Sequence, residues 1–411
     1  MDKHKGLFTK TLVIGIILLF ICMSITPSFA VDNPVSSGNI LYVGGSGEGN
    51  YSKIQDAIDN ASNGDTIFVF SNASPYHENV VVDKSIFLIG EDKNNVVLDG
   101  DFKGNVITLT VDDVFVSGFT MINPHVENDF WVSALVDIVS SENVTVKDNI
   151  VHRYEVVFGN NNAGIILRNS SHCFIQNNTL ITEPDTSRAF GVVLLSDSKF
   201  NNISGNEASL FNSGVYLYDD GCTDNVIYMN YLHHNIDGVF FIYVNNNTII
   251  NNIINFNSCE GIRFEDSSNN LIIGNTITDN GEGKWIDNGI GLIGGSNNYI
   301  SFNHISRNNP YGIKIISKSS RVTYNDISNN EVGVYCDMGF NNHMTRNNFI
   351  KNERNGYFEV GILYSRNYWD RNYWNRPRLL PYPVFGYLLG VFSEFHWVNF
   401  DWHPAQEPYD I

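Results

Sequence analysis

The sequence is short of cysteine, and this shortage excludes several ways of holding a fold together. Five cysteines occur in 411 residues, and no two form a CxxC pair. Cys173, Cys222, Cys259 and Cys336 fall at different points of the repeat described below, so we expect free thiols rather than disulfides. Hydrophobic packing and hydrogen bonds must therefore stabilise the chain.

Cationic side chains are also scarce. The chain has 25 Lys and Arg residues against 44 Asp and Glu residues, which gives a formal net charge of −19. Such a surface repels nucleic acid and anionic lipid, and it favours solubility and cation binding. We therefore expect no nucleic-acid partner.

Long apolar runs are absent after the first residues. The run "TLVIGIILLFICMSI" follows several lysines and precedes small residues that end at Ala30, which is typical of a secretory signal peptide spanning residues 1–30. We expect cleavage there and a secreted or cell-surface protein. The alternative is an uncleaved anchor, which normally needs about twenty apolar residues; only in that case is a membrane a partner.

Helical periodicity is rare as well. Residues 51–61, "YSKIQDAIDNA", place Ile54, Ala57, Ile58 and Ala61 on one face, and this is the one convincing helix expected after the signal peptide. An amphipathic helix before the first coil of a solenoid covers its exposed edge. We therefore predict a linker and capping helix over residues 31–62.

What the chain has in abundance is a repeat of about 23 residues. Its first marker is a glycine followed by alternating apolar residues, at Gly164, Gly191, Gly214, Gly238, Gly261, Gly289, Gly312 and Gly333. Its second is an asparagine in an apolar strand, at Asn149, Asn178, Asn206, Asn230, Asn252, Asn275, Asn303, Asn325 and Asn348. A further asparagine often follows five residues later, at Asn235, Asn257, Asn280, Asn308 and Asn330.

Each repeat contains two short strand patterns and cannot bury its own apolar face, so the repeats must stack. A parallel β-helix fits better than a leucine-rich repeat, because the LxxLxL frame is missing. Stacked asparagines can then hydrogen-bond along the axis as a ladder. We predict an all-β, right-handed parallel β-helix over residues 63–375, with an irregular C-terminal cap over residues 376–411.

The segments "IQDAIDNASNGDTIFVF" and "YHENVVVDKSIFLIGEDKNNVVLDG", followed by the asparagine-rich coils, resemble the NosD-type branch of the pectin lyase-like β-helix superfamily. The resemblance covers about residues 40–375, and the endings "NYWDRNYWNRPR" and "FDWHPAQEPYDI" are similar to those of exported archaeal members. It implies either a periplasmic copper-binding protein or a carbohydrate-binding and sugar hydrolase domain. The fold hosts lyases, hydrolases, binders and structural proteins, so it does not choose among them.

Insertions of the repeat share one corner, at residues 122–134, 152–163, 182–190 and 281–288. Insertions at one corner lie on one side of a solenoid, often the binding side. Beside them, positions two and four after each repeat glycine should point outward. This places aromatic and charged side chains beside the loops, as a sugar-binding surface requires, with candidate ligand-binding residues Trp131, Tyr154, Tyr216, Tyr218, Phe240, Trp285, Lys314 and Tyr335. The alternative is that these rings pack as ordinary cross-strand contacts.

Acidic residues gather in the middle coils. Asp237 and Glu260 each precede a repeat glycine on adjacent coils, and Arg263 and Glu265 project beside them. Carboxylates so close suit a glycosidase pair, or a lyase that uses Ca²⁺ with Arg263 or Lys314 as base. Asp237, Glu260, Arg263 and Glu265 are therefore the candidate catalytic residues, with solvated turn carboxylates as the alternative.

The histidines do not stack at one repeat position, and the adjacent His233 and His234 should point to opposite faces of a strand. Copper is therefore not expected from the ligand pattern, and Ca²⁺ is the candidate ion. We expect an exported β-helix that binds polysaccharide. The alternatives are a polysaccharide lyase or glycoside hydrolase, a NosD-like copper accessory protein, and a structural surface protein.

Overall fold

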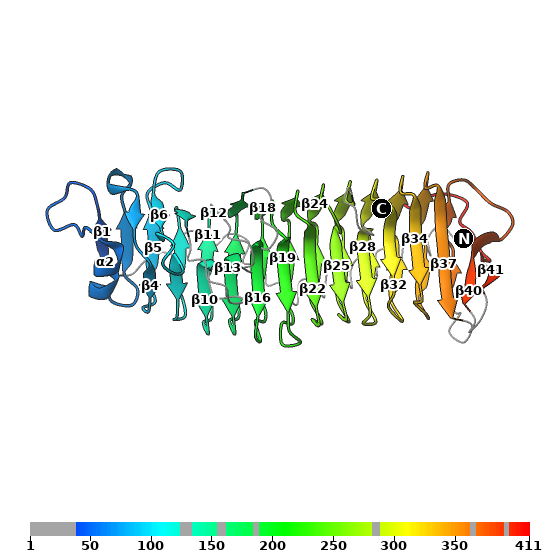
Figure 1. The fold of residues 1–411 in the computed structure, drawn as a ribbon, viewed down its shortest axis with the longest axis horizontal. Helices are drawn as coiled ribbons and strands as arrows, with labels where there is room; N and C mark the ends of the chain where they lie inside the picture. Colours follow the sequence, from blue (N-terminus) through cyan, green and yellow to red (C-terminus); the bar gives the residue numbers. More distant parts are fainter. Residues whose placement is uncertain are drawn as a thin grey trace, which may run out of the picture. The chain divides into compact units, whose positions relative to one another are not determined.

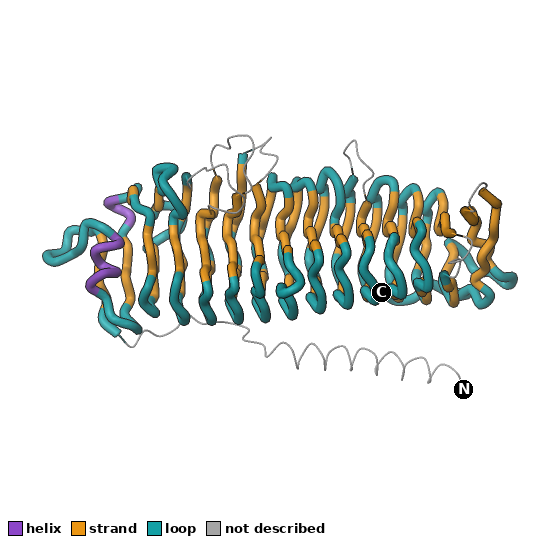
Figure 2. Tube along the Cα trace, turned by 60° about the horizontal axis from the view of Figure 1, so that its bottom comes forward, coloured by secondary structure: helices purple, strands orange, loops and turns teal. Residues whose placement is uncertain are grey.

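The computed structural model describes residues 38–123, 134–153, 162–183, 189–281, 288–361, 367–389 and 394–411. Within these ranges the chain winds into stacked coils that form three parallel sheets, here called A, B and C (Figures 1 and 2). Each coil contributes three short strands rather than the two expected from the sequence. The prediction of an all-β parallel β-helix is confirmed, and none of the described helices is long and apolar enough to cross a membrane.

Sheet A has 14 strands. Its strands, in the order in which they pair, are β1 (Ile40–Val43), β2 (Thr66–Val69), β5 (Phe87–Gly90), β8 (Phe115–Ser117), β11 (Thr145–Lys147), β14 (Phe174–Gln176), β17 (Asn202–Ser204), β20 (Val226–Tyr228), β23 (Thr248–Ile250), β26 (Leu271–Ile273), β29 (Tyr299–Ser301), β32 (Arg321–Thr323), β35 (His343–Thr345) and β38 (Tyr368–Asp370).

Sheet B has 13 strands. They are β3 (Tyr76–His77), β6 (Val97–Asp99), β9 (Thr120–Ile122), β12 (Ile150–Arg153), β15 (Thr179–Thr182), β18 (Glu207–Ser209), β21 (Tyr231–His233), β24 (Ile253–Asn255), β27 (Thr276–Thr278), β30 (His304–Ser306), β33 (Asp326–Ser328), β36 (Asn348–Ile350) and β39 (Tyr373–Trp374).

Sheet C has 14 strands and runs along the side of the rod that faces the reader in Figure 1. They are β4 (Val80–Val82), β7 (Ile107–Leu109), β10 (Ala134–Val139), β13 (Asn162–Arg168), β16 (Ala189–Leu195), β19 (Ser213–Tyr218), β22 (Asp237–Ile242), β25 (Ile262–Glu265), β28 (Asn288–Ile293), β31 (Tyr311–Ile315), β34 (Val332–Asp337), β37 (Arg354–Gly361), β40 (Tyr382–Leu389) and β41 (Glu394–Asp401).

The two ends of the rod differ. At the N-terminal end, helix α2 (Ile54–Asn60) buries Ile54, Ala57 and Ile58, and the backbone N–H groups of Ile54 and Gln55 donate to the Glu78 carboxylate. Strand β1, within the segment expected to be a linker, already pairs with β2. A 3₁₀ turn, η1, covers Ser71–Ala73.

At the C-terminal end, the segment expected to be irregular contains a β-hairpin. Strand β40 continues sheet C in parallel with β37, and β41 pairs with β40 in the antiparallel sense. The hairpin lies at the red end of the rod in Figure 1. Because its strands carry no trace of the repeat, the sequence pattern did not reveal them.

Buried asparagines stack at all three corners between the sheets. At the corner between sheets A and B, each backbone N–H donates to the side-chain oxygen of the next asparagine, in the series Asn149, Asn178, Asn206, Asn230, Asn252, Asn275, Asn303, Asn325, Asn347 and Asn372. Most members also donate Nδ2–H to that same oxygen, for example from Asn252 to Asn275 at 2.9 Å. The predicted ladder is confirmed, except that Asn347 replaces Asn348, which instead binds the backbone of Tyr409.

A second ladder between sheets B and C runs from Asn235 through Asn257, Asn280, Asn308 and Asn330, as predicted, and ends at Asn352. A third, between sheets C and A, was not anticipated: Asn201, Asn225, Asn247, Asn270, Asn298, Ser320, Asn342 and Asn367. The three ladders satisfy buried backbone groups in the coils through which they run.

Close contact between neighbouring coils explains why the repeat positions hold glycine. A Cβ atom on Gly238 would lie 2.5 Å from the carbonyl oxygen of Gly261 on the next coil. No side chain fits at that distance, so only glycine lets the coils approach here. The apolar residues that follow, such as Val239 and Phe241, are fully buried in one continuous core.

Candidate functional site

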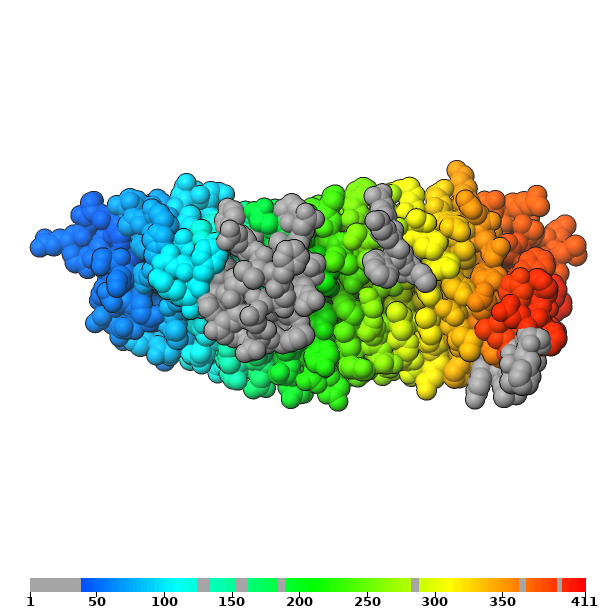
Figure 3. Space-filling view, in the orientation of Figure 1, coloured from blue at the N-terminus to red at the C-terminus, as the bar shows by residue number. Residues whose placement is uncertain are grey.

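The outer face of sheet C carries a row of side chains in strict register from coil to coil. We call it the outer row: Asp137, Ile166, Val193, Tyr216, Phe240, Arg263, Gly291, Lys314, Tyr335, Tyr357 and Phe385. The predicted alternation is confirmed, because positions one and three after the glycines are buried in the core. The chemistry of the outer row changes along the rod, whose surface Figure 3 shows in the same orientation as Figure 1.

After Asp137, the first half of the outer row is apolar. Ile166, Val193 and Tyr216 belong to a second buried cluster outside the main core, and Phe240 packs against it. Burial raises the pKa of the Tyr216 hydroxyl far above its usual range. This part of the row offers little accessible surface to a ligand.

Arg263 marks the change from apolar to polar side chains. Its Nε atom lies 3.4 Å from a Glu260 carboxylate oxygen, and Nη1 lies 4.0 Å from Asp237. Its Nε–H also donates to Glu265 at 3.0 Å, and the guanidinium stacks on Phe240, 4.6 Å from the ring centroid. The structure therefore brings together the four residues predicted as catalytic, with the arginine among three carboxylates.

Burial makes this charged cluster unusual for the outside of a sheet. The side chains of Asp237 and Glu260 are 3% and 6% exposed, whereas that of Arg263 is 34% exposed. Burial alone would lower the pKa of Arg263, but the carboxylates of Glu260, Asp237 and Glu265 raise it above its usual value. Arg263 therefore stays cationic and is unsuited to act as the base of a lyase.

The neighbouring coil fixes the position of Glu260. Asn288 donates a 2.5 Å hydrogen bond from Nδ2 to Glu260 Oε1. Gly291 leaves room for this carboxylate, because a Cβ atom there would collide with Oε1. The Oδ1 atom of Asn288 is buried without a hydrogen-bond partner among the described residues. These contacts hold Glu260 against Arg263.

Beyond Gly291, the outer row holds Lys314 and two tyrosines, whose polar atoms contact carboxylates of the same sheet. Lys314 Nζ lies 3.1 Å from Asp337 and over the ring of Tyr335, 5.7 Å from its centroid. The hydroxyls of Tyr335 and Tyr357 both donate to Glu359, at 2.9 and 2.8 Å. Their rings stack 5.4 Å apart.

The outer row ends in a groove that the sequence did not predict. The groove has a volume of about 720 Å³, and residues of β37, β40 and β41 line it. Its aromatic and charged residues are Glu353, Arg354, Tyr357, Tyr382, Phe385, Tyr387, His396 and Trp397. The side chain of Arg354 lies over the Tyr357 ring at 4.6 Å. The one sequence signal for this groove is the aromatic content of residues 376–411.

A smaller hollow of about 490 Å³ lies where strands of sheet C turn toward sheet A. Its lining combines Tyr218, Asp219, Asp220, Tyr243, Asn245 and Asp266. Tyr218 is 42% exposed and Tyr243 is 50% exposed. This hollow includes one predicted ligand-binding residue, and it faces away from the insertion corner.

The predicted ligand-binding residues separate into three groups. Tyr216 and Tyr335 are each 7% exposed, so they serve as cross-strand packing, which was the alternative reading of these rings. Tyr218 is exposed, and Phe240 and Lys314 are partly buried. Trp131, Tyr154 and Trp285 lie outside the described residues. Most residues of the four insertions also lie outside the described residues, and in each case the strands before and after them belong to sheet B and sheet C.

The expectation that His233 and His234 point to opposite faces is wrong. Their Nδ1 atoms lie 2.7 Å apart, and Glu207 contacts the Nε2 atom of His233 at 3.1 Å. His234 has a positive φ of 54°, so the chain leaves the strand there and the usual alternation ends. The four cysteines of the described chain are free, as expected, and burial raises the pKa of Cys173, Cys222 and Cys336 to about 12.

Comparisons with known proteins agree with this architecture. Residues 220–379 match the family described as periplasmic copper-binding protein (NosD), and residues 134–289 match that described as right handed beta helix region. The resemblance to NosD-type β-helix proteins is thus confirmed. No curated protein matches the chain.

Among solved structures, a glucanase domain has the same fold. The catalytic domain of a GH87 alpha-1,3-glucanase in complex with tetrasaccharides has a TM-score of 0.57 and 14% identity, covering 85% of this chain and 71% of that one. A mannuronan C-5 epimerase A-module from Azotobacter vinelandii has a TM-score of 0.49 and 15% identity, covering 78% and 89%. At such identities the likeness concerns the fold alone.

Proposed function

We propose that this protein binds polysaccharide on the outer face of sheet C, with the groove beside β37, β40 and β41 as the main contact. One observation carries the proposal: Phe385 and Trp397 line this groove and are 61% and 51% exposed, beside the charged side chains of Glu353 and Arg354. Rings stack on the apolar faces of sugars, while charged groups bind their hydroxyls. The glucanase domain, which has a similar fold and is named as a complex with tetrasaccharides, supports the proposal.

The groove can be tested with two exposed tryptophans of the same segment. Trp397 lines the groove, whereas Trp402 is 64% exposed and is not among the groove residues. An array of neutral and uronate-containing polymers would identify a ligand, and calorimetry would give its Kd. We expect Trp397→Ala to raise Kd about tenfold, or about 1.4 kcal/mol, and Trp402→Ala to change it less than about twofold. Absence of binding to every polymer, or equal effects of both substitutions, would contradict the proposal.

Lyase or glycoside hydrolase activity is the alternative that the cluster of Asp237, Glu260, Arg263 and Glu265 favours. With Arg263 held as a cation, its role there is to bind a carboxylate or hydroxyl of the sugar, and the glutamates are left as acid, base or Ca²⁺ ligands. Product release from uronate-containing and neutral polymers, with and without Ca²⁺, is the measurement. Activity that survives both Glu260→Gln and Glu265→Gln would remove these residues from the mechanism.

Copper binding is a second candidate function, favoured by the pair of His233 and His234. Glu207 contacts Nε2 of His233, which suits a carboxylate that orients a metal-binding imidazole, and the two Nδ1 atoms are the donors available to an ion. The described residues 220–379 contain no group of three close His, Cys, Asp or Glu ligands, so the pair offers an open site. Electron paramagnetic resonance of added Cu²⁺ should show two nitrogen ligands, which His234→Asn would reduce to one or none.

Export completes the proposal. The lysine-rich start, the apolar run and the small residues before Ala30 support removal of residues 1–30 and a place outside the cell or on its surface. Mass spectrometry of the protein purified from its source should find a chain that begins at Val31. A chain that retains residues 1–30 would instead indicate an anchor.

A further inference from the structure

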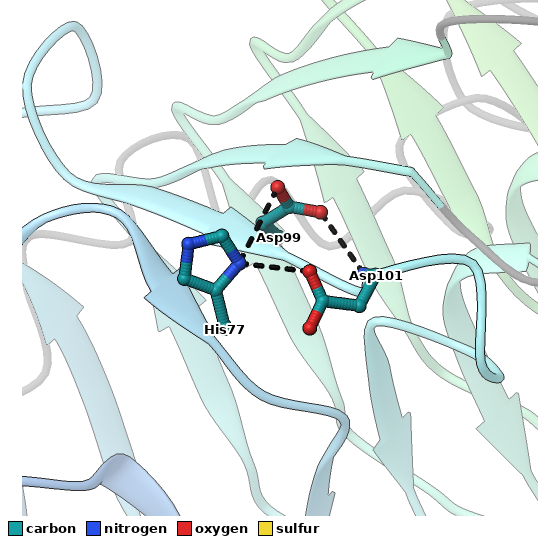
Figure 4. A group of neighbouring side chains, drawn as sticks. All are labelled: His77, Asp99 and Asp101. Atoms are coloured by element: carbon teal, nitrogen blue, oxygen red, sulfur yellow. Dashed lines mark hydrogen bonds and ion pairs between the residues drawn. The ribbon is translucent and has the colours of Figure 1, made fainter.

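Three metal-ligating side chains meet among the first coils, far along the sequence from the groove. His77 ends β3, Asp99 ends β6, and Asp101 lies in the turn that follows (Figure 4). The register of sheet B pairs His77 with Asp99, so these two side chains are neighbours on adjacent coils. Asp101 turns toward them because its backbone has a positive φ of 50°.

The distances within this group suit a shared ion. His77 Nδ1 lies 2.8 Å from Asp101 Oδ1 and 3.6 Å from Asp99 Oδ2. All three ligand atoms lie within 4.8 Å of one another, and no other group of three does so in the described part of the chain. Bonds of about 2.0–2.2 Å to one tetrahedral ion put ligand atoms about 3.4 Å apart, which is close to these values.

Other side chains already hold the two carboxylates in place. Asp99 Oδ1 accepts hydrogen bonds from Asn123 Nδ2 and from the Asp101 backbone N–H, both at 3.0 Å. Asp101 Oδ2 accepts from Lys103 Nζ at 3.0 Å. In each carboxylate, one oxygen therefore accepts these hydrogen bonds and the other oxygen faces His77. Supporting contacts of this kind orient the ligands of metal sites.

The charge of the group also fits a cation. The two carboxylates of Asp99 and Asp101 supply negative charge, which attracts a cation. One imidazole nitrogen with two carboxylate oxygens suits a divalent first-row transition ion. Ca²⁺ and Mg²⁺ prefer oxygen ligands throughout, and Cu⁺ prefers thiolates and thioethers.

We infer that His77, Asp99 and Asp101 form a binding site for a divalent first-row transition ion such as Zn²⁺. On binding, Nδ1 of the neutral His77 ring gives up its hydrogen bond to Asp101 and bonds to the ion, while the ring proton moves to Nε2. Water completes the coordination, since the His77 side chain is 53% exposed. The ion joins β3, β6 and the following turn, and so holds the first coils together. The site lies outside residues 220–379 and 134–289, which match known families.

The test is a titration of the metal-free full chain with Zn²⁺, followed by calorimetry and by thermal unfolding. We expect Zn²⁺ to raise Tm, because an ion that binds only the folded state stabilises it. Ca²⁺ and Mg²⁺ at the same concentration should leave Tm unchanged. Co²⁺ should give a visible absorption band that reports coordination directly.

Three variants make the test specific. His77→Gln and Asp99→Asn should each weaken Zn²⁺ binding at least tenfold. His403→Gln is the matched control, because His403 Nδ1 makes the same 2.8 Å contact to one carboxylate, that of Asp370, outside any three-ligand group. It should bind Zn²⁺ like the unchanged chain.

Two outcomes would overturn the inference. One is Zn²⁺ binding that persists unchanged in His77→Gln, and the other is a Tm rise with Ca²⁺ as large as that with Zn²⁺. Should Asp99→Asn fail to fold, His77→Gln still decides, since the exposed His77 side chain contributes little to packing. A tenfold loss in that variant, with the metal-free Tm preserved, would establish the site.

Discussion

The same coils make the corner ladders and the outer row, yet the ladders repeat one type of residue from coil to coil, whereas the outer row changes its residue type. At the corner between sheets A and B, one asparagine after another makes the same two contacts to its neighbour. Along the outer row, the same register position holds isoleucine, valine, tyrosine, phenylalanine, arginine, glycine and lysine in turn. Uniform positions therefore define the fold, and a site for a ligand must be sought where neighbouring coils differ.

Removing one rung of a ladder should have the largest effect on stability. Asn252 donates from Nδ2 to Ile227, Ile250 and Asn275, and its Oδ1 accepts two hydrogen bonds from Asn230. Asn252→Leu leaves these buried partners unsatisfied, and we expect it to lower the free energy of unfolding by about 4 kcal/mol. Chemical denaturation monitored by circular dichroism measures the change.

Asn255, on the next strand, is the control for that substitution. Its Oδ1 atom is buried without a partner among the described residues, so Asn255→Ala should cost less than about 1 kcal/mol. Equal losses for the two substitutions would mean that the ladder adds nothing beyond ordinary packing.

Removing the positive charge at Arg263 should have the next largest effect, and it tests the outer row directly. Arg263→Met leaves the buried carboxylates of Asp237 and Glu260 without their counter-charge, which should cost about 3 kcal/mol. Arg307→Met is the control: Arg307 makes two 2.7 Å hydrogen bonds to Asp279, but its side chain is 54% exposed, so less than about 1 kcal/mol is expected. If denaturation showed similar losses in the free energy of unfolding for both variants, burial would add nothing to the stabilisation that the ion pairs of Arg263 provide.

The sequence predicted the uniform part of the molecule well. Spacing of glycine and asparagine gave the stacked coils, two of the ladders and the outward face. The third ladder was not predicted, although Asn201, Asn225, Asn247, Asn270 and Asn298 recur before Ser320 interrupts it. In the double asparagine at 347 and 348 the wrong member was chosen.

The site was predicted only where it depends on register. Arg263 and its carboxylates were found because stacked coils put equivalent positions side by side. The groove depends on β40 pairing with β37 and on β41 folding back, which no repeat encodes. The His233 and His234 pair depends on one positive φ angle, and the His77 group on another at Asp101. Local backbone departures of this kind leave little trace in a strand pattern.

The smallest effect should come from pH, and it compares two carboxyls of opposite behaviour. Burial raises the pKa of Asp137 in the outer row, although Arg168 opposes the shift, whereas hydrogen bonds from Arg307 lower the pKa of Asp279. Folded Asp137 binds a proton more readily than the unfolded chain does, so lowering the pH from 7 to about 4 should stabilise the natural chain relative to Asp137→Asn. Asp279 should show the reverse, since its stabilising charge is lost as the pH falls. When the pH falls from 7 to about 4, the denaturation midpoint of the natural chain should rise relative to that of Asp137→Asn and fall relative to that of Asp279→Asn. A change of the same sign in both comparisons would refute burial as the dominant cause at Asp137.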